Sequence, residues 1–145
     1  MPVPFRFDTV LRVREAERDR SRQALVLEQL RQASLIDERN RVTADRLEVL
    51  DALRLAHQGN GLPADQELAR RQYADYLATE IERLTTALYE VRGAIALRRN
   101  ELLEADTAVK ALEKLAGRHA ADQQQIEFKN AERERDDTWR PGRVA

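Results

Sequence analysis

The second half of the chain carries a regular seven-residue repeat of apolar side chains. Residues seven apart form one row of this repeat: Ala74, Ile81, Leu88, Ile95, Leu102, Val109 and Ala116. The other row begins three residues later: Leu77, Leu84, Val91, Arg98, Ala105 and Leu112. Steps that alternate between three and four residues mark the a and d positions of a left-handed coiled coil. The pattern therefore predicts a helix packed along one stripe, with the polar Arg98 fixing the register.

The first half of the chain is less regular. Its apolar positions begin with Val13, Ala24, Leu27 and Leu30. A row of residues seven apart follows, made up of Leu35, Val42, Val49 and Ala56, and it is flanked by Ile36, Thr43, Leu47 and Leu50. This pattern predicts a second helix with a broad stripe that faces one partner.

Helix-breaking residues divide the chain at one internal place. The segment Gln58-Gly59-Asn60-Gly61-Leu62-Pro63 combines two glycines, Asn and Pro, which is typical of a turn followed by a new helix. Asp8 is expected to be the N-cap of the first helix. We expect a single domain over 1–145, with helices over about 8–57 and 64–137, a turn over 58–63 and a frayed tail over 138–145.

A short connection makes two helices antiparallel neighbours, so the fold class predicted is all-α, an antiparallel coiled-coil hairpin with the longer helix second. Folding about residues 60–61 places residue i opposite roughly residue 121 − i. Asp8 is then expected near Glu113, and everything after Leu115 is expected to lack a first-helix partner. The seam positions of that overhang are His119, Gln123 and Ile126, and such a polar helix is expected to fray or to be ordered by a partner.

Composition excludes several classes of protein. Ala, Glu, Lys, Leu and Arg make up 80 of the 145 residues, whereas the 5 Gly and 4 Pro are too few for the turns of a sandwich or barrel. The net charge is −1 although 35% of the residues are charged, which argues against nucleic acid as the main partner. The chain has no cysteine, no apolar run long enough for a membrane span and no signal-type segment after Met1, so a soluble protein is expected.

Catalytic chemistry is not expected. The chain has no glycine-rich phosphate loop, nucleophile elbow or zinc-protease motif, and a two-helix hairpin offers no deep pocket. The fold-back separates the two histidines, His57 and His119, and His119 with Asp122 does not complete a metal site. We therefore expect no catalytic residue, no cofactor and no metal. Glu67–Arg71 and Asp106–Lys110 are expected to be solvated ion pairs along a helix.

Several segments together resemble the FliJ family, the soluble coiled-coil component of the bacterial flagellar export apparatus. The opening Phe5-Arg6-Phe7 through Glu15 is similar to that family's F-x-F-x-x-[VL]-L-x-x-R-E start, and Tyr73-x-x-Tyr76-Leu77 to the aromatic start of its second helix. Lys110-x-Leu112-Glu113-Lys114-Leu115 and the charged ending Glu132 to Asp137 resemble two further family segments, although the usual Asp-Glu is Asp136-Asp137 here.

The resemblance implies a non-enzymatic stalk, similar to the central stalk of rotary ATPases. It further implies binding to the export ATPase (FliI-like) ring, to the export gate protein (FlhA-like) and to substrate chaperones, at the cytoplasmic face of the inner membrane without insertion into it. A stalk of a virulence-type secretion system and a self-associating coiled-coil scaffold are the alternatives. Nucleic-acid binding is disfavoured, because acidic residues interleave with Arg12 to Arg22.

Two sets of candidate partner-binding residues follow from the exposed aromatic positions and the resemblance. The set expected to contact the ATPase lies at the open end and comprises Phe5, Phe7, Arg14, Arg118, Gln125, Ile126 and Arg133. The set expected to contact the gate lies near the turn and comprises Tyr73, Tyr76, Glu80 and Arg83. The alternative interpretation is local packing for the two phenylalanines and for Tyr73, and simple solvation for Tyr76.

Overall fold

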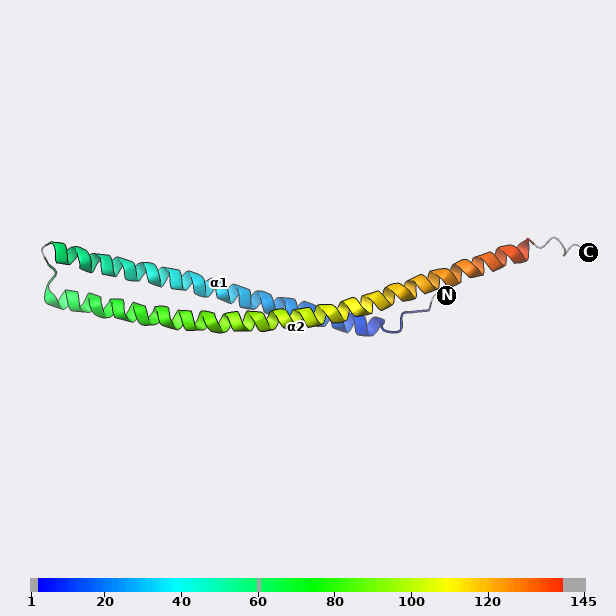
Figure 1. The fold of residues 1–145 in the computed structure, drawn as a ribbon, viewed down its shortest axis with the longest axis horizontal. Helices are drawn as coiled ribbons and strands as arrows, with labels where there is room; N and C mark the ends of the chain where they lie inside the picture. The colour runs from blue at the N-terminus through cyan, green and yellow to red at the C-terminus, as the bar shows by residue number, and fades with distance from the viewer. Residues whose placement is uncertain (1–2, 60, 140–145) are drawn as a thin grey trace, which may run out of the picture. The chain divides into compact units, whose positions relative to one another are not determined.

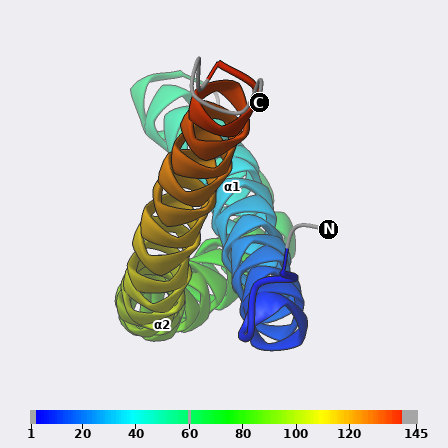
Figure 2. The same ribbon diagram turned by 90° about the vertical axis from the view of Figure 1, so that its right-hand side faces the viewer.

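The computed structural model describes residues 3–59 and 61–139, and both regular elements in that part of the chain are helices. They are α1 (Asp8–Gln58) and α2 (Ala64–Thr138), which contact each other as a hairpin (Figure 1; Figure 2). The predicted fold class, an all-α antiparallel hairpin with the longer helix second, is confirmed. No helix among these residues is long and apolar enough to cross a membrane.

Each helix begins with a turn fixed by backbone hydrogen bonds. The N–H of Leu11 donates to the carbonyl of Phe7 at 2.8 Å, so Asp8 is the first residue of α1 and the N-cap position falls on Phe7. The expected capping role of Asp8 is therefore wrong by one residue. Its carboxylate instead pairs with Arg12 one turn later, at 3.3 Å. The carbonyl of Pro63 accepts the N–H groups of both Gln66 and Glu67 at 3.0 Å, which starts α2 at Ala64.

The hairpin divides into two compact units. The described residues of one are 3–21 and 101–139, and those of the other are 22–59 and 61–100. Two contacts within the second unit define the register: the Nε of Arg46 donates to the carbonyl of Ala74 at 3.4 Å, and Arg83 lies 3.7 Å from Glu38. Both agree with the predicted pairing of residue i with about 121 − i.

The predicted seam of α2 is the core of the hairpin. In the second unit its buried members are Ala74, Leu77, Leu84, Leu88, Val91 and Ile95, with Leu84 only 0% and Leu88 only 1% exposed. Arg98 and Ile81 are half-buried. In the other unit Val109 is 0% exposed, and Leu102, Ala105, Leu112 and Ala116 are half-buried. Every residue assigned to the two rows is thus removed from solvent at least in part.

The seam of α1 differs from the predicted stripe. The row Leu35, Val42, Val49 and Ala56 is half-buried as expected, but Val13, Leu27, Leu30 and Leu47 are more than half exposed. The second seam row is instead polar in most of its members: Leu25, Gln32, Arg39, Arg46 and Leu53 in the second unit, and Leu11 and Arg18 in the first. The aliphatic stems of arginine can cover an apolar partner while the guanidinium reaches solvent, so this row escapes a search for apolar residues.

In the unit of residues 3–21 and 101–139, the non-helical residues before α1 also contact α2. His119 Nε2 lies 2.8 Å from the carbonyl oxygen of Val3, and the Phe5 ring lies 5.7 Å from the imidazole ring. Contacts with the N-terminal side of the hairpin therefore continue past Leu115 to His119. These contacts come from the non-helical residues before Asp8 and not from α1, so they do not contradict the expectation that α2 has no first-helix partner after Leu115.

Glu28 is a weak point of the α1 seam and gives a stability prediction. It occupies a half-buried seam position, and its Oε2 is buried with no hydrogen-bond partner. An unsatisfied buried carboxylate oxygen costs about 1–3 kcal/mol. We expect Glu28→Leu to raise the free energy of unfolding by about 1 kcal/mol, measured by urea denaturation. The matched change at the exposed Glu48 should have little effect, and a lower stability of the Glu28 variant would contradict the assignment.

Candidate interaction surfaces

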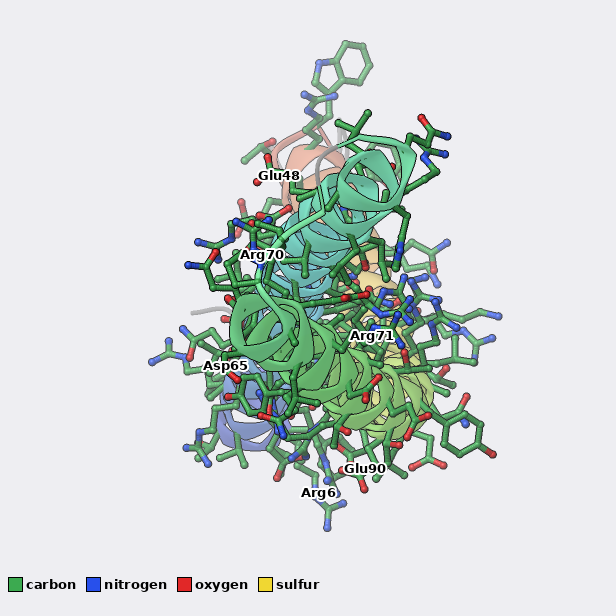
Figure 3. All side chains as sticks on the ribbon, turned by 90° about the vertical axis from the view of Figure 1, so that its left-hand side faces the viewer. Arg6, Glu48, Asp65, Arg70, Arg71 and Glu90 are labelled. Carbon is green, nitrogen blue, oxygen red and sulfur yellow. The ribbon has the colours of Figure 1, made fainter. Side chains whose placement is uncertain are left out.

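The candidate sites are groups of exposed side chains on the described residues. No group of three or more His, Cys, Asp or Glu side chains among them could hold a metal ion. His57 Nε2 lies 2.9 Å from Glu67 Oε1 and 3.3 Å from Arg71 Nη2, which joins the end of α1 to the start of α2. Figure 3 shows Arg71 on this part of α2, on a different side of the helix from Arg70. The expected ion pairs Glu67–Arg71 and Asp106–Lys110 are both present at 2.9 Å.

The two phenylalanines of the candidate ATPase set form a small aromatic cluster. The rings of Phe5 and Phe7 meet edge to face at 5.9 Å, and the guanidinium of Arg6 lies 5.5 Å from the centre of the Phe7 ring. Phe5 is half-buried and also contacts His119, whereas Phe7 is 39% exposed. Phe5 therefore has a packing role on α2, and Phe7 presents part of its ring to solvent.

Arg14 lies in a different part of the same unit. Its Nη1 donates to Glu17 Oε2 at 3.0 Å on α1. Together with Ser21, these two residues line a shallow depression whose other side is formed by Glu101, Glu104, Ala105 and Ala108 of α2. No hydrogen bond, ion pair or ring contact joins Arg14 to the described phenylalanines.

The remaining members of the ATPase set lie on α2. Arg118, Gln125, Ile126 and Arg133 are all exposed, and Ile126 exposes 51% of its surface. Phe128, which the sequence analysis did not select, is 65% exposed and shares a shallow depression with Ala121, Gln124, Gln125 and Lys129. Phe128 lies between charged residues, in a part of the chain where the heptad repeat weakens. Apart from its aromatic ring, nothing in the sequence indicates that it is a binding residue. This stretch combines apolar side chains with a long helical surface that α1 does not cover.

The tyrosines of the candidate gate set lie together on the surface. Tyr73 and Tyr76 stack with ring centres 6.4 Å apart and an angle of 22° between the rings. They expose 49% and 58% of their surfaces, which agrees with their flanking and outward heptad positions. The stacked pair presents a continuous aromatic surface near the start of α2.

The polar members of the gate set form an ion-pair cluster. Two guanidinium nitrogens of Arg83 donate to Glu80 Oε2, at 3.1 and 2.9 Å, and Glu38 of α1 lies 3.7 Å away. The hydrogen bond to Glu80, followed by the charge of that carboxylate, raises the pKa of Arg83 above its ordinary value. Arg83 therefore stays cationic beside the tyrosines and links the two helices on this face.

The comparisons with known proteins give one match. A family model described as "Flagellar FliJ protein" matches residues 4–139, which is nearly the whole chain. No curated protein and no solved structure matches the chain.

Proposed function

Because this chain belongs to the FliJ family and is a coiled-coil protein associated with flagellar export, we propose that it is a non-enzymatic stalk connecting the export ATPase to the export gate. The observation that carries the proposal is the long α2 surface beyond His119, which α1 does not pair with, in a chain that the family match places in export. A single marginal helix gains order when a partner covers it. A ring of ATPase subunits of the FliI-like kind provides such a cover.

The proposed ATPase contact uses the surface of the unit that contains the phenylalanines. Phe7 and Ile126 provide exposed apolar side chains, and Arg118, Gln125 and Arg133 provide exposed polar side chains. Arg14 is a less direct member, since its guanidinium is already paired with Glu17. Phe128 joins this set on the strength of its exposure.

The proposed gate contact uses the other unit. Stacked tyrosines that are about half exposed supply apolar area with polar edges, and aromatic side chains are enriched among the anchors of protein interfaces. The cation of Arg83 and the carboxylate of Glu80 border this area. A FlhA-like gate protein is the proposed partner, and substrate chaperones are further partners of the same stalk.

A two-partner binding experiment tests this function. The purified chain is expected to bind both the export ATPase and the cytoplasmic domain of the gate protein, each measured by titration calorimetry. Tyr76→Ala should weaken gate binding by about 1 kcal/mol or more, about fivefold, while ATPase binding and the melting temperature stay nearly unchanged. The matched control is Tyr89→Ala, since Tyr89 is 79% exposed on the same helix but is not part of the stacked pair.

Three results would count against all or part of the proposal. If the chain bound neither partner, the connecting role would be wrong and the self-associating scaffold would become the better interpretation. If Tyr76→Ala unfolded the hairpin while the remaining folded chain bound the gate normally, the residue would be structural. Normal gate binding by a stable Tyr76→Ala variant would remove the tyrosines from the site.

A further inference from the structure

The seam of α2 extends beyond the level at which α1 begins. In the unit of residues 3–21 and 101–139, the residues that line the shallow depression between the helices agree with the pairing of residue i with about 121 − i: Arg14, Glu17 and Ser21 on α1, with Ala108, Glu104 and Glu101 on α2. The first residue of α1 is Asp8, which is therefore level with about Glu113. Seam positions of α2 after that level have no partner on α1.

Burial nevertheless continues along the seam for a further stretch. Ala116, His119 and Gln123 are half-buried, whereas the residues between them are exposed. Every described residue from Gln124 onward is exposed, and Ile126, which follows His119 in the same seam row, exposes 51% of its surface. Another segment of the chain therefore covers the seam up to about Gln123.

This cover is the segment of residues 3–7, which we call the strap. The Nε2 of His119 donates a hydrogen bond to the carbonyl of Val3 at 2.8 Å, and the Phe5 ring lies 5.7 Å from the imidazole ring. Phe5 is half-buried, whereas the other strap residues are exposed. Pro4 lacks an N–H group and disfavours a helical backbone at Val3, so the strap does not continue α1 as a helix. His119 is the point at which the strap is held on α2.

The contacts of the strap allow it to open without unfolding the hairpin. One end is attached to α1 through the hydrogen bond from the N–H of Asp8 to the carbonyl of Phe5, at 3.2 Å. The other end is held at His119 by a hydrogen bond and a ring contact, while Val3 is 61% exposed. Segments with few buried contacts open locally at a much lower free energy than the whole fold. A protein partner can therefore replace the strap.

We propose that the strap is a removable cover of the α2 seam, which a helix of the export ATPase displaces when it binds. This inference rests on the proposed function, in which Gln125 and Ile126 belong to the ATPase contact. Ile126 is the next seam position after Gln123, and a coiled-coil partner follows the seam. A partner helix of ordinary length, about 11 residues, that packs on Ile126 extends over Gln123 to His119, where the strap lies in the free chain.

Displacement of the strap also releases the phenylalanines. In the closed strap the Phe5 ring packs on His119 and meets the Phe7 ring edge to face at 5.9 Å. In the open strap both rings are accessible beside the uncovered seam, and both belong to the candidate ATPase set. The apparent affinity of a surface that is open for only part of the time is lowered by the open fraction. The strap therefore restrains ATPase binding, and its opening strengthens binding.

Cross-linking of the free chain tests whether the strap is closed. The chain has no cysteine, so two engineered cysteines are its only thiols. A short bis-maleimide linker should join Val3→Cys to Asp122→Cys much faster than it joins Val3→Cys to Glu132→Cys, because residue 132 lies about 20 Å beyond His119 along the helix. His119→Ala should slow the first reaction at least threefold. Equal rates for the two cysteine pairs overturn the closed strap, and an unchanged rate in His119→Ala overturns the role of His119.

Calorimetric titration with the export ATPase tests the competition. The chain linked between residues 3 and 122 should bind at least tenfold more weakly than the same variant with each thiol capped by a single maleimide. His119→Ala should bind at least threefold more tightly than the natural chain, whereas Lys114→Ala, a change at an exposed residue of the same helix, should bind as the natural chain does. Circular dichroism should show unchanged helix content in all variants.

The outcomes separate this inference from the proposed function. Equal binding by the linked and capped chains overturns the inference and leaves the proposed function standing. Weaker binding by His119→Ala also overturns it, because the closed strap would then be part of the contact. Absence of binding by every form contradicts the proposed function and the competition together, whereas the linking rates still measure closure of the strap.

Discussion

Leu88→Ala is expected to destabilise the hairpin by about 2–5 kcal/mol, the cost of truncating a fully buried leucine. Leu88 is 1% exposed and lies between Leu84 and Val91 in the seam of α2. The truncated side chain leaves a cavity against a helix whose own seam is rich in polar residues, so few apolar atoms can move in to fill it. Urea denaturation followed by circular dichroism measures the change.

The control for this prediction is Leu103→Ala on the same helix. Leu103 is 66% exposed, and alanine is at least as good a helix former as leucine, so this change should alter stability by less than about 0.5 kcal/mol. Equal effects of the two substitutions would mean that the seam is not the core. A loss of several kcal/mol at Leu88 alone would locate the stability of the hairpin in the rows of apolar residues along α2.

The sequence periodicity predicted which residues of α2 face the partner helix, but it predicted those of α1 only in part. Every residue assigned to the two rows of α2 is buried or half-buried, because apolar side chains occupy all but one of those positions. In α1 one seam row contains Gln32, Arg39 and Arg46, whose chemical type does not distinguish them from solvated residues. The opposite error occurred at Leu27 and Leu47, which are apolar and yet exposed. A helix with a polar seam and an apolar outer surface cannot be oriented by hydropathy alone.

The residues of the candidate surfaces were also predictable only where the heptad repeat is regular. The heptad frame of α2 correctly predicted that Tyr73 and Tyr76 would be accessible, since their angular positions depend only on the well-defined seam. It could not predict the contact between His119 and Val3, because the residues before Asp8 are not helical and periodicity does not specify their path. Phe128 was missed because the repeat weakens beyond Ala116, where polar residues take the seam positions.

Removal of residues 124–145 is expected to abolish binding to the export ATPase and the stimulation of its ATP hydrolysis. The truncated chain retains His119 with its contacts to Val3 and Phe5, so the described packing before the deletion is preserved. It loses Gln125, Ile126, Phe128 and Arg133, which supply most of the exposed surface of the proposed contact. Because interface energy is concentrated in a few anchors, loss of this whole group should lower the affinity by more than a hundredfold.

The control must separate loss of these side chains from loss of helix length. Full-length chain with Ile126→Glu and Phe128→Glu keeps the helical segment but replaces its two large exposed apolar residues, so its binding should be reduced nearly as much as in the truncation. Lys129→Gln, which changes a neighbouring exposed charge, should bind within a few-fold of the natural chain. The ATP hydrolysis rate is measured at saturating ATP over a titration with each variant. Unchanged stimulation by the truncated chain would show that the ATPase contact lies elsewhere, since the long unpaired part of α2 would then have no part in it.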